Sequence, residues 1–300
     1  MTTAVKIADS HTDEWHAART TGIGASEAAA ACGVSEWDTP FSVYAKKTGL
    51  VGETPDNDAM FWGRKLEPIV LERWLERSGY DLRQYPCPMY RHRHIDWQRA
   101  TPDAELSSGD AVEIKTTNWR RAKTLGQQGT DEAPAEWVMQ CQQQMAVVGY
   151  DAVHLVVLID GGRLWTGLVE RNRDLIDRMT ELEAALWDRI VRRDPPEPDW
   201  THPRTPELIR GLYGLDADKV VDVPMEIVAE WKRQKELAEQ IKTLEQEREI
   251  ARAKVLHCLQ DAGVGRAVDG SMELHRREVK GGMVPAFMRK GYTSVREVSK

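Results

Sequence analysis

The sequence is poor in cysteine and has no long apolar run. Its four cysteines, Cys32, Cys87, Cys141 and Cys258, are scattered and form no C-x-x-C pair. A zinc or iron–sulfur site is therefore not expected, and reduced thiols are. No run of about 18 apolar residues is present, which argues against a membrane span. The first ten residues lack the apolar segment of a signal peptide, so a cytoplasmic location is expected.

Positive charge is also in the minority. Lys and Arg number 41 against 48 Asp and Glu, a net charge of −7. This argues against a generally basic nucleic-acid-binding coat but is compatible with a local basic groove. The P-loop, H-E-x-x-H and G-x-S-x-G motifs are all absent, so no rival catalytic motif competes for the assignment.

What is present is a compact polar motif in residues 101–115, T-P-D-A-E-L-S-S-G-D-A-V-E-I-K. Its two halves read as short strands around a Ser-Ser-Gly-Asp turn, which predicts a hairpin. The expected strands are 98–103 and 110–116. Side chains alternate along a strand, so Glu113 and Lys115 share one face and Ile114 lies on the other. If that face lies beside Asp103, two carboxylates and an ammonium converge.

Two neighbouring carboxylates repel each other, and a hard divalent cation with oxygen ligands removes the repulsion. Mg²⁺ typically takes one or two carboxylates together with substrate phosphate. A lysine beside such an ion can hold or deprotonate an attacking water. The motif therefore favours metal-dependent phosphodiester hydrolysis.

Upstream, a helix at 14–19 is followed by T-T-G-I-G-A-S and an alanine-rich run. Ser26 is a candidate helix N-cap, and a helix N-terminus with a hydroxyl can bind an anion. Arg19 could add a charge-assisted contact to phosphate. An ordinary capped helix with a surface arginine explains the same residues.

Two further helices carry polar residues on or near apolar stripes. The first, 60–78, has Trp62, Leu66, Ile69, Val70 and Trp74 at helical spacing. Glu67 lies at the edge of that stripe, either solvated or directed into a cleft. The second, 134–149, carries Gln140, Gln142, Gln143 and Gln144. Most of these amides are expected to face solvent, and one could position water or phosphate.

A basic segment follows the motif. Lys115, Arg120, Arg121 and Lys123 are its charges, with Trp119 among them. Cations interleaved with an aromatic residue suit a nucleic-acid backbone, although a solvated loop has the same composition.

The composition changes after residue 200, which predicts a first domain over 1–200 and a C-terminal extension over 201–300. A charged helix is expected at 225–259 and a small hairpin at 267–279. The helix has a four-three apolar spacing interrupted by Arg248. Both a pairing helix and a helix on the domain's own surface fit this pattern.

Five blocks in order resemble the phage lambda exonuclease-like (YqaJ-type viral recombinase) family of the PD-(D/E)XK nuclease superfamily. They cover roughly residues 14–170, and their sequences are E-W-H-A-A-R-T-T-G-I-G-A-S-E, F-W-G-R-K-L-E-P, T-P-D, E-I-K and W-V-M-Q-C-Q-Q-Q-M-A-V-V-G. The resemblance implies an α/β (mixed α+β) restriction-endonuclease-like core, with a central mixed sheet flanked by helices.

The resemblance also implies roles for individual residues. Asp103, Glu113 and the Ile114 backbone carbonyl would hold the metal, Glu67 would complete the acidic site, and Lys115 would orient or deprotonate the water. Gln140 would assist near Lys115, with Gln142 or Gln144 as alternatives. Phosphate would be bound by Arg19 and Ser26, and the basic segment would add Arg120 and Arg121. Two Mg²⁺ ions are expected, with Mn²⁺ as a substitute.

The function implied is a 5′-to-3′ exonuclease on double-stranded DNA ends that leaves 3′ single strands for phage recombination by strand annealing. A single-strand annealing protein and a homo-oligomeric ring are the partners implied, in the host cytoplasm if the chain is phage-encoded. Two alternatives stay open. One is an endonuclease or a 3′-directed nuclease on the same fold, and the other is a non-catalytic scaffold that binds DNA ends.

Overall fold

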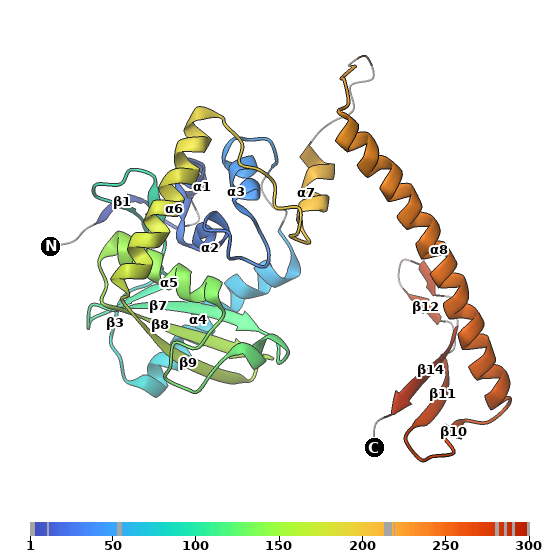
Figure 1. Cartoon of the computed structure of the whole chain (residues 1–300). Helices are drawn as coiled ribbons and strands as arrows, with labels where there is room; N and C mark the ends of the chain where they lie inside the picture. Colours follow the sequence, from blue (N-terminus) through green and yellow to red (C-terminus); the bar gives the residue numbers. More distant parts are fainter. Residues whose placement is uncertain are drawn as a thin grey trace. The chain divides into compact units, whose positions relative to one another are not determined.

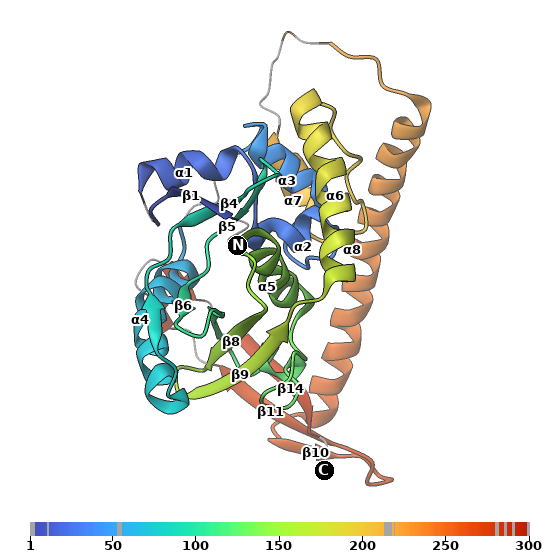
Figure 2. The same ribbon diagram turned by 90° about the vertical axis from the view of Figure 1, so that its left-hand side faces the viewer.

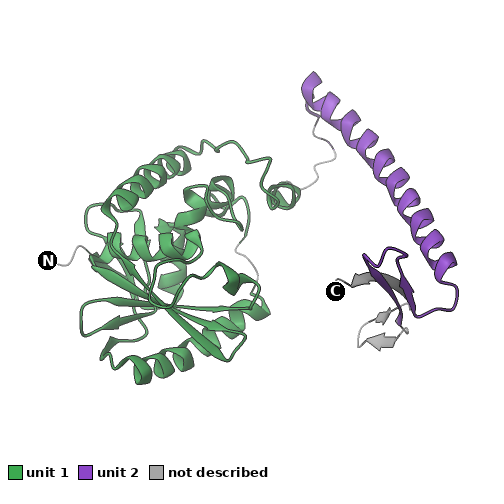
Figure 3. Ribbon diagram, turned by 60° about the horizontal axis from the view of Figure 1, so that its bottom comes forward, with its two compact units in different colours: residues 1–215 green, residues 216–300 purple. Residues whose placement is uncertain are grey.

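The computed structural model describes residues 4–10, 12–52, 56–212, 218, 220–279, 282–284, 287–289 and 292–298. The chain forms two compact units, Met1–Leu215 and Asp216–Lys300 (Figure 3). The composition placed the boundary at residue 200, whereas helix α7 (Thr205–Leu212) still belongs to the first unit. Among the described residues, no helix is both long and apolar enough to cross a membrane.

The first unit is built on a five-stranded mixed sheet in the order β3-β6-β7-β8-β9. Its strands are β3 (Leu82–Gln84), β6 (Ala104–Leu106), β7 (Ala111–Thr117), β8 (Ala152–Ile159) and β9 (Arg163–Glu170). β7 and β8 run parallel and the other neighbours are antiparallel. The predicted mixed sheet is confirmed.

Helices cover both faces of this sheet, as Figure 1 shows for α4 (Asp58–Ser78) and α5 (Ala135–Val148). Parallel strands need a crossover connection, and α5 supplies it between β7 and β8. Cys141 and Met145 of α5 pack in one apolar cluster with Ala111 of β7. Val70, Leu71 and Trp74 of α4 pack in a second cluster with Val112 and Ile114. The alternation predicted for β7 is confirmed, because its even-numbered apolar residues face α4.

The stripe predicted on α4 is only partly correct. Val70 and Trp74 are buried, but Trp62 and Ile69 are 57% and 59% exposed. Asn57 caps the helix by accepting a hydrogen bond from the Met60 N–H, and Gly79 ends it in the left-handed conformation. The packed face is therefore narrower than the predicted stripe, since Ile69 is exposed although its neighbour Val70 is buried.

A second sheet of four strands, in the order β1-β4-β5-β2, lies on the other side of α5. Its strands are β1 (Ala4–Ala8), β2 (Ile23–Gly24), β4 (Met89–His92) and β5 (Gln98–Ala100). The helical elements around it are α1 (Asp13–Thr20), η1 (Ala25–Glu27), α2 (Ala28–Ala31), α3 (Pro40–Lys47) and α6 (Arg173–Arg192), and a short turn η2 (Arg121–Thr124) follows β7. Figure 2 shows α1 and β1 close to β4 and β5.

The predicted hairpin needs a correction. Its second strand is β7, but of the segment predicted as its first strand, 98–103, only Gln98–Ala100 is a strand, and residues 101–103 lie outside any strand. β5 joins the four-stranded sheet, and the chain resumes as β6 in the five-stranded one. Pro102 lies at the break, where its missing N–H removes a ladder donor. Asp103 therefore stands at the junction of the two sheets.

The second unit contains α8 (Met225–Leu259), whose bounds agree with those predicted, and only Leu259 of that helix is buried. Its strands are β10 (Val264–Arg266), β11 (Glu273–Val279), β12 (Gly282–Val284), β13 (Phe287–Arg289) and β14 (Tyr292–Val298). The hairpin predicted at 267–279 in fact pairs β10 with β11. The first strand, β10, lies upstream of the predicted residue 267 because the turn is longer than expected. The Ala267 N–H donates to the Met272 carbonyl across this turn.

Candidate active site

Asp103 is held against β7 by a backbone hydrogen bond. β6 is short, and its last described pair with β7 joins Ala104 to Val112. The Ile114 N–H lies beyond that pair and donates to Asp103 Oδ2 at 2.7 Å. The Asp103 side chain thus takes the place of a strand neighbour, which fixes one of its oxygens and leaves the other available.

Glu113 is the buried centre of the site, with 2% of its surface exposed. Its Oε1 accepts from Lys115 Nζ and from Gln140 Nε2, both at 2.6 Å, and its Oε2 accepts from Gln144 Nε2 at 2.5 Å. Lys115 Nζ also donates to Gln140 Oε1 at 2.9 Å. The predicted convergence of Glu113, Lys115 and Gln140 is therefore present in the structure.

The open question about the glutamines also has an answer. Gln140 and Gln144 lie four residues apart, on one face of α5, and both contact Glu113. Gln142 points elsewhere, donating to the Glu170 carbonyl at 2.8 Å and accepting from the Asn172 N–H at 2.9 Å.

The acidic groups are close enough to perturb one another. Burial, followed by the charges of Glu113 and Glu67, raises the pKa of Asp103 well above its ordinary value. Burial and the charge of Glu113 likewise raise the pKa of Glu67, against a hydrogen bond from Tyr85. Glu67 also lines a cavity with Asp103, so of the two positions expected for it the cleft is the one observed.

Lys115 balances part of this negative charge. Burial alone lowers its pKa, but the charges of Glu113 and Asp103 outweigh burial and raise it. The ammonium is consequently protonated at neutral pH and serves as a hydrogen-bond donor.

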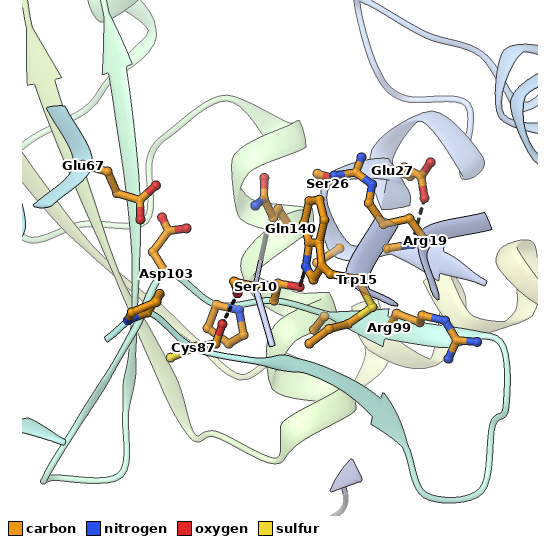
Figure 4. A pocket seen from close by; sticks show the side chains of 17 residues that line it. Ser10, Trp15, Arg19, Ser26, Glu27, Glu67, Cys87, Arg99, Asp103 and Gln140 are labelled. Carbon is orange, nitrogen blue, oxygen red and sulfur yellow. Dashed lines mark hydrogen bonds between the residues drawn. The ribbon is translucent and has the colours of Figure 1, made fainter. Parts of the chain in front are cut away.

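Arg19 and Ser26 line the same cavity as Glu67, Asp103 and Gln140, a space of about 140 Å³. Figure 4 shows Glu67 and Asp103 on one side of it, and Arg19 and Ser26 on the other. The Arg19 guanidinium lies 4.7 Å from the ring centre of Trp15. The cavity thus joins an acidic end to an end with a cation and a hydroxyl.

The N-cap predicted at Ser26 is wrong. Ser26 lies within η1, which begins after Gly24. The Gly24 N–H donates to the Glu27 carboxylate at 2.9 Å, so the turn starts earlier than the serine. The exposed Ser26 hydroxyl faces the cavity instead of closing a helix end.

A second cavity of about 370 Å³ meets the first at Ser26, Glu27 and Gln140. Lys115 lines this second cavity, whereas Asp103 and Glu67 line the first. Gln140 therefore stands between the ammonium side and the carboxylate side of the site.

The two basic-segment arginines differ. Arg121 lines the second cavity, pairs with Glu36 at 3.3 Å and with Glu136, and lies 5.4 Å from the ring centres of Trp37 and Trp137. Arg120 is exposed and lies 5.6 Å from the ring centre of Trp119. Two carboxylates already compensate the charge of Arg121, so Arg120 is the freer of the two for a phosphate.

Several contributors were missed from the sequence. Tyr85 hydrogen-bonds Glu67, and Cys87 lines the first cavity. Lys47, nearly buried, pairs with Glu27 at 2.6 Å and donates to the Arg19 carbonyl at 2.6 Å, so it braces the segment that carries Arg19 and Ser26. These contacts join residues far apart in the chain, and no local pattern indicates them.

The donor set fits a hard divalent cation. Among the described residues, no three His, Cys, Asp or Glu side chains form a ready-made metal cluster. The available oxygens are those of Asp103, Glu113 and Glu67, whose mutual repulsion a cation would relieve. Carboxylate oxygens without thiolate or imidazole suit Mg²⁺ or Mn²⁺ better than Zn²⁺.

Comparison with known proteins finds a family model that matches part of the chain. Residues 14–151 match the model of the YqaJ-like viral recombinase domain. The matched region includes every side chain described above as lining the first cavity from Trp15 onward, including Arg19, Glu67, Asp103 and Gln140.

Relatives extend the match beyond the YqaJ-like domain. The uncharacterized protein YqaJ of Bacillus subtilis (strain 168) is 28% identical over 258 residues, covering 84% of this chain and 80% of that protein. An alkaline exonuclease (LHK-Exo) from Laribacter hongkongensis shares the fold, with a TM-score of 0.52 and 22% identity over 66% of this chain and 100% of its own. Its complex with dAMP gives the same values. The likeness to this exonuclease is one of fold.

Proposed function

We propose that this protein is a divalent-metal-dependent deoxyribonuclease that degrades the 5′-ended strand of double-stranded DNA ends. One observation carries the proposal. The acidic group of Glu67 and Asp103 shares a cavity with Arg19 and Ser26, and Glu113 and Lys115 adjoin it through Gln140. Such a cavity offers places for a metal, a scissile phosphate and a terminal phosphate side by side.

Asp103, Glu113, Glu67 and the Ile114 carbonyl would hold the ion, with two Mg²⁺ as the expected complement. When bound, the metal would supply charge stabilisation and a more acidic water. Lys115, protonated at neutral pH, would orient the attacking water by donating a hydrogen bond to it. Gln140 accepts a hydrogen bond from Lys115 and donates one to Glu113, so it fixes the position of the ammonium relative to the carboxylate.

The end that contains Arg19 supports a preference for a 5′-phosphate. A guanidinium and a hydroxyl are both suited to phosphate oxygens, and Lys47 fixes the backbone that carries them. Arg120 and Arg121 would contact the DNA backbone beyond the site. The 3′ single strand left behind would be the substrate of an annealing protein, and a ring-shaped oligomer would keep the enzyme on its DNA.

The test is digestion of end-labelled linear duplexes with Mg²⁺ that differ only in a 5′-phosphate or a 5′-hydroxyl. Faster release of 5′-mononucleotides from the phosphorylated duplex is expected, and EDTA should abolish it. Release from the 3′ end would contradict the proposed direction. Cutting of a covalently closed circle would indicate an endonuclease, and DNA binding without cleavage in Mg²⁺ or Mn²⁺ would indicate a scaffold.

A further inference from the structure

Gln144 is a fully buried amide on α5, with 0% of its surface exposed. Its neighbours along the same part of the helix include the buried apolar residues Cys141, Met145 and Val148. An apolar side chain of similar volume, such as methionine, would suit this environment without desolvating an amide. The presence of a glutamine here therefore calls for a specific polar partner.

That partner is the Glu113 carboxylate, and the contact uses only half of the amide. Gln144 Nε2 donates to Glu113 Oε2 at 2.5 Å, while Gln144 Oε1 is buried without a hydrogen-bond partner among the described residues. A buried orphan acceptor is costly and calls for an explanation. Rotating the amide would bring its carbonyl oxygen against the carboxylate, so the charge of Glu113 sets the orientation of Gln144.

The two oxygens of Glu113 consequently have different surroundings. Oε1 is shared by Lys115 and Gln140, the side chains that line the two cavities. Oε2 faces only Gln144 in the hydrogen bonds described for it. A carboxylate held by one oxygen from the buried side can turn only the other oxygen toward the cleft.

We propose that Gln144 is a positioning residue, which anchors Glu113 Oε2 so that Oε1 is the oxygen presented to a divalent cation. The inference rests on the proposed function for the nature of the ion. Residues that orient a metal ligand typically change metal affinity or activity by about 10–100-fold when mutated. The role differs from that of Gln140, which contacts Lys115 as well as Glu113.

The test compares Gln144→Met with Gln142→Met, a matched control on the same helix. Gln142 is also buried, at 2% exposure, but its amide holds the Glu170 carbonyl and the Asn172 N–H. Calorimetric titration of the DNA-free full-length chain with Mn²⁺ is the main readout. Gln144→Met should weaken Mn²⁺ binding by about 10–100-fold, and Gln142→Met should lower the unfolding temperature without changing Mn²⁺ binding.

A second variant, Gln144→Asn, keeps the amide but shortens its reach, so it should weaken Mn²⁺ binding in the same way. Cleavage of linear duplex by both Gln144 variants should recover toward the wild-type rate as Mn²⁺ is raised. A purely structural role would lower the rate at every Mn²⁺ concentration.

Wild-type Mn²⁺ affinity in folded Gln144→Met and Gln144→Asn, alongside intact wild-type cleavage, would overturn the inference and leave the proposed function standing. Failure of both variants to fold would assign Gln144 to stability and also overturn it. A wild-type chain that neither binds Mn²⁺ nor cuts DNA would refute the proposed function and the inference together.

Discussion

Replacing Lys115 with alanine should separate cleavage from DNA binding. The ammonium donates to Glu113 at 2.6 Å and to Gln140 at 2.9 Å, and 22% of the side chain is exposed. The ammonium is thus held in place by Glu113 and Gln140 and remains partly accessible to solvent. A group that orients water needs both properties. We expect DNA binding to persist and metal-dependent cleavage to be nearly lost.

The magnitude follows from these contacts. Loss of a positioned proton-transfer or water-orienting group costs about 10²–10⁴-fold in rate, or roughly 3–5 kcal/mol of activation free energy. Gln140 and Gln144 still donate to Glu113 in the variant, so the loss of folding stability should be about 1–3 kcal/mol. The variant has one fewer cation near the phosphates. The slope of the logarithm of the DNA-binding constant against the logarithm of the salt concentration should therefore decrease in magnitude by at most about 1.

The assay is single-turnover release of labelled nucleotides in Mg²⁺, with DNA affinity measured at fixed salt. Lys123→Ala is the matched control, because Lys123 is an exposed cation on the same segment that lies 4.7 Å from the Trp119 ring centre. It should leave the cleavage rate unchanged. A folded Lys115→Ala variant that cleaves at the wild-type rate would refute the proposed site.

Other perturbations test separate parts of the structure. Arg19→Ala should reduce the preference for a 5′-phosphate over a 5′-hydroxyl end by about 10-fold or more, the effect of losing a charged hydrogen bond of roughly 1.5–3 kcal/mol; an unchanged preference would exclude Arg19 from that contact. The pKa values of Asp103 and Glu67 are raised, so protons compete with the metal for these carboxylates. The cleavage rate should therefore fall as the pH is lowered, and a higher Mg²⁺ concentration should move this fall to lower pH. A pH–rate profile that does not change with Mg²⁺ concentration would count against these two ligands. Burial raises the pKa of Glu183 to about 8, above its ordinary 4.5, so the folded chain retains a proton that the unfolded chain releases. Between about pH 5 and pH 8 the free energy of unfolding of the wild type should therefore decrease with pH more steeply than that of Glu183→Gln. The difference between the two slopes is at most about 1.4 kcal/mol per pH unit, and urea unfolding at each pH measures it. Equal slopes would contradict the raised pKa of Glu183. Trp74→Ala should cost about 3–5 kcal/mol in urea unfolding, since Trp74 of α4 is 4% exposed and lies in one apolar cluster with Val112 and Ile114 of β7. A loss below 1 kcal/mol would contradict that packing.

Local patterns predicted the elements whose causes are local. The 225–259 helix, the helix that became α5 and the alternation along β7 all depend on neighbouring residues, and all agree with the structure. The strand predicted at 98–103 failed because β5 ends at Ala100 and pairs in the four-stranded sheet, whereas the antiparallel partner of β7 is β6, which begins at Ala104. No local pattern records these pairings. The N-cap at Ser26 failed because Glu27 reaches back to Gly24.

The site divides in the same way. The sequence alone determined that Asp103, Glu113 and Lys115 occur together in one short segment, because a strand with period two places Glu113 and Lys115 on one face. Only the tertiary structure decided which side chains surround them. Glu67 reaches the site because α4 packs beneath β7, and Gln144 rather than Gln142 reaches Glu113 because the rotation of α5 against the sheet is set by its buried apolar residues. Each residue of a helix turns about 100° from the last, so that rotation is a property of the packed core and is absent from the order of the glutamines.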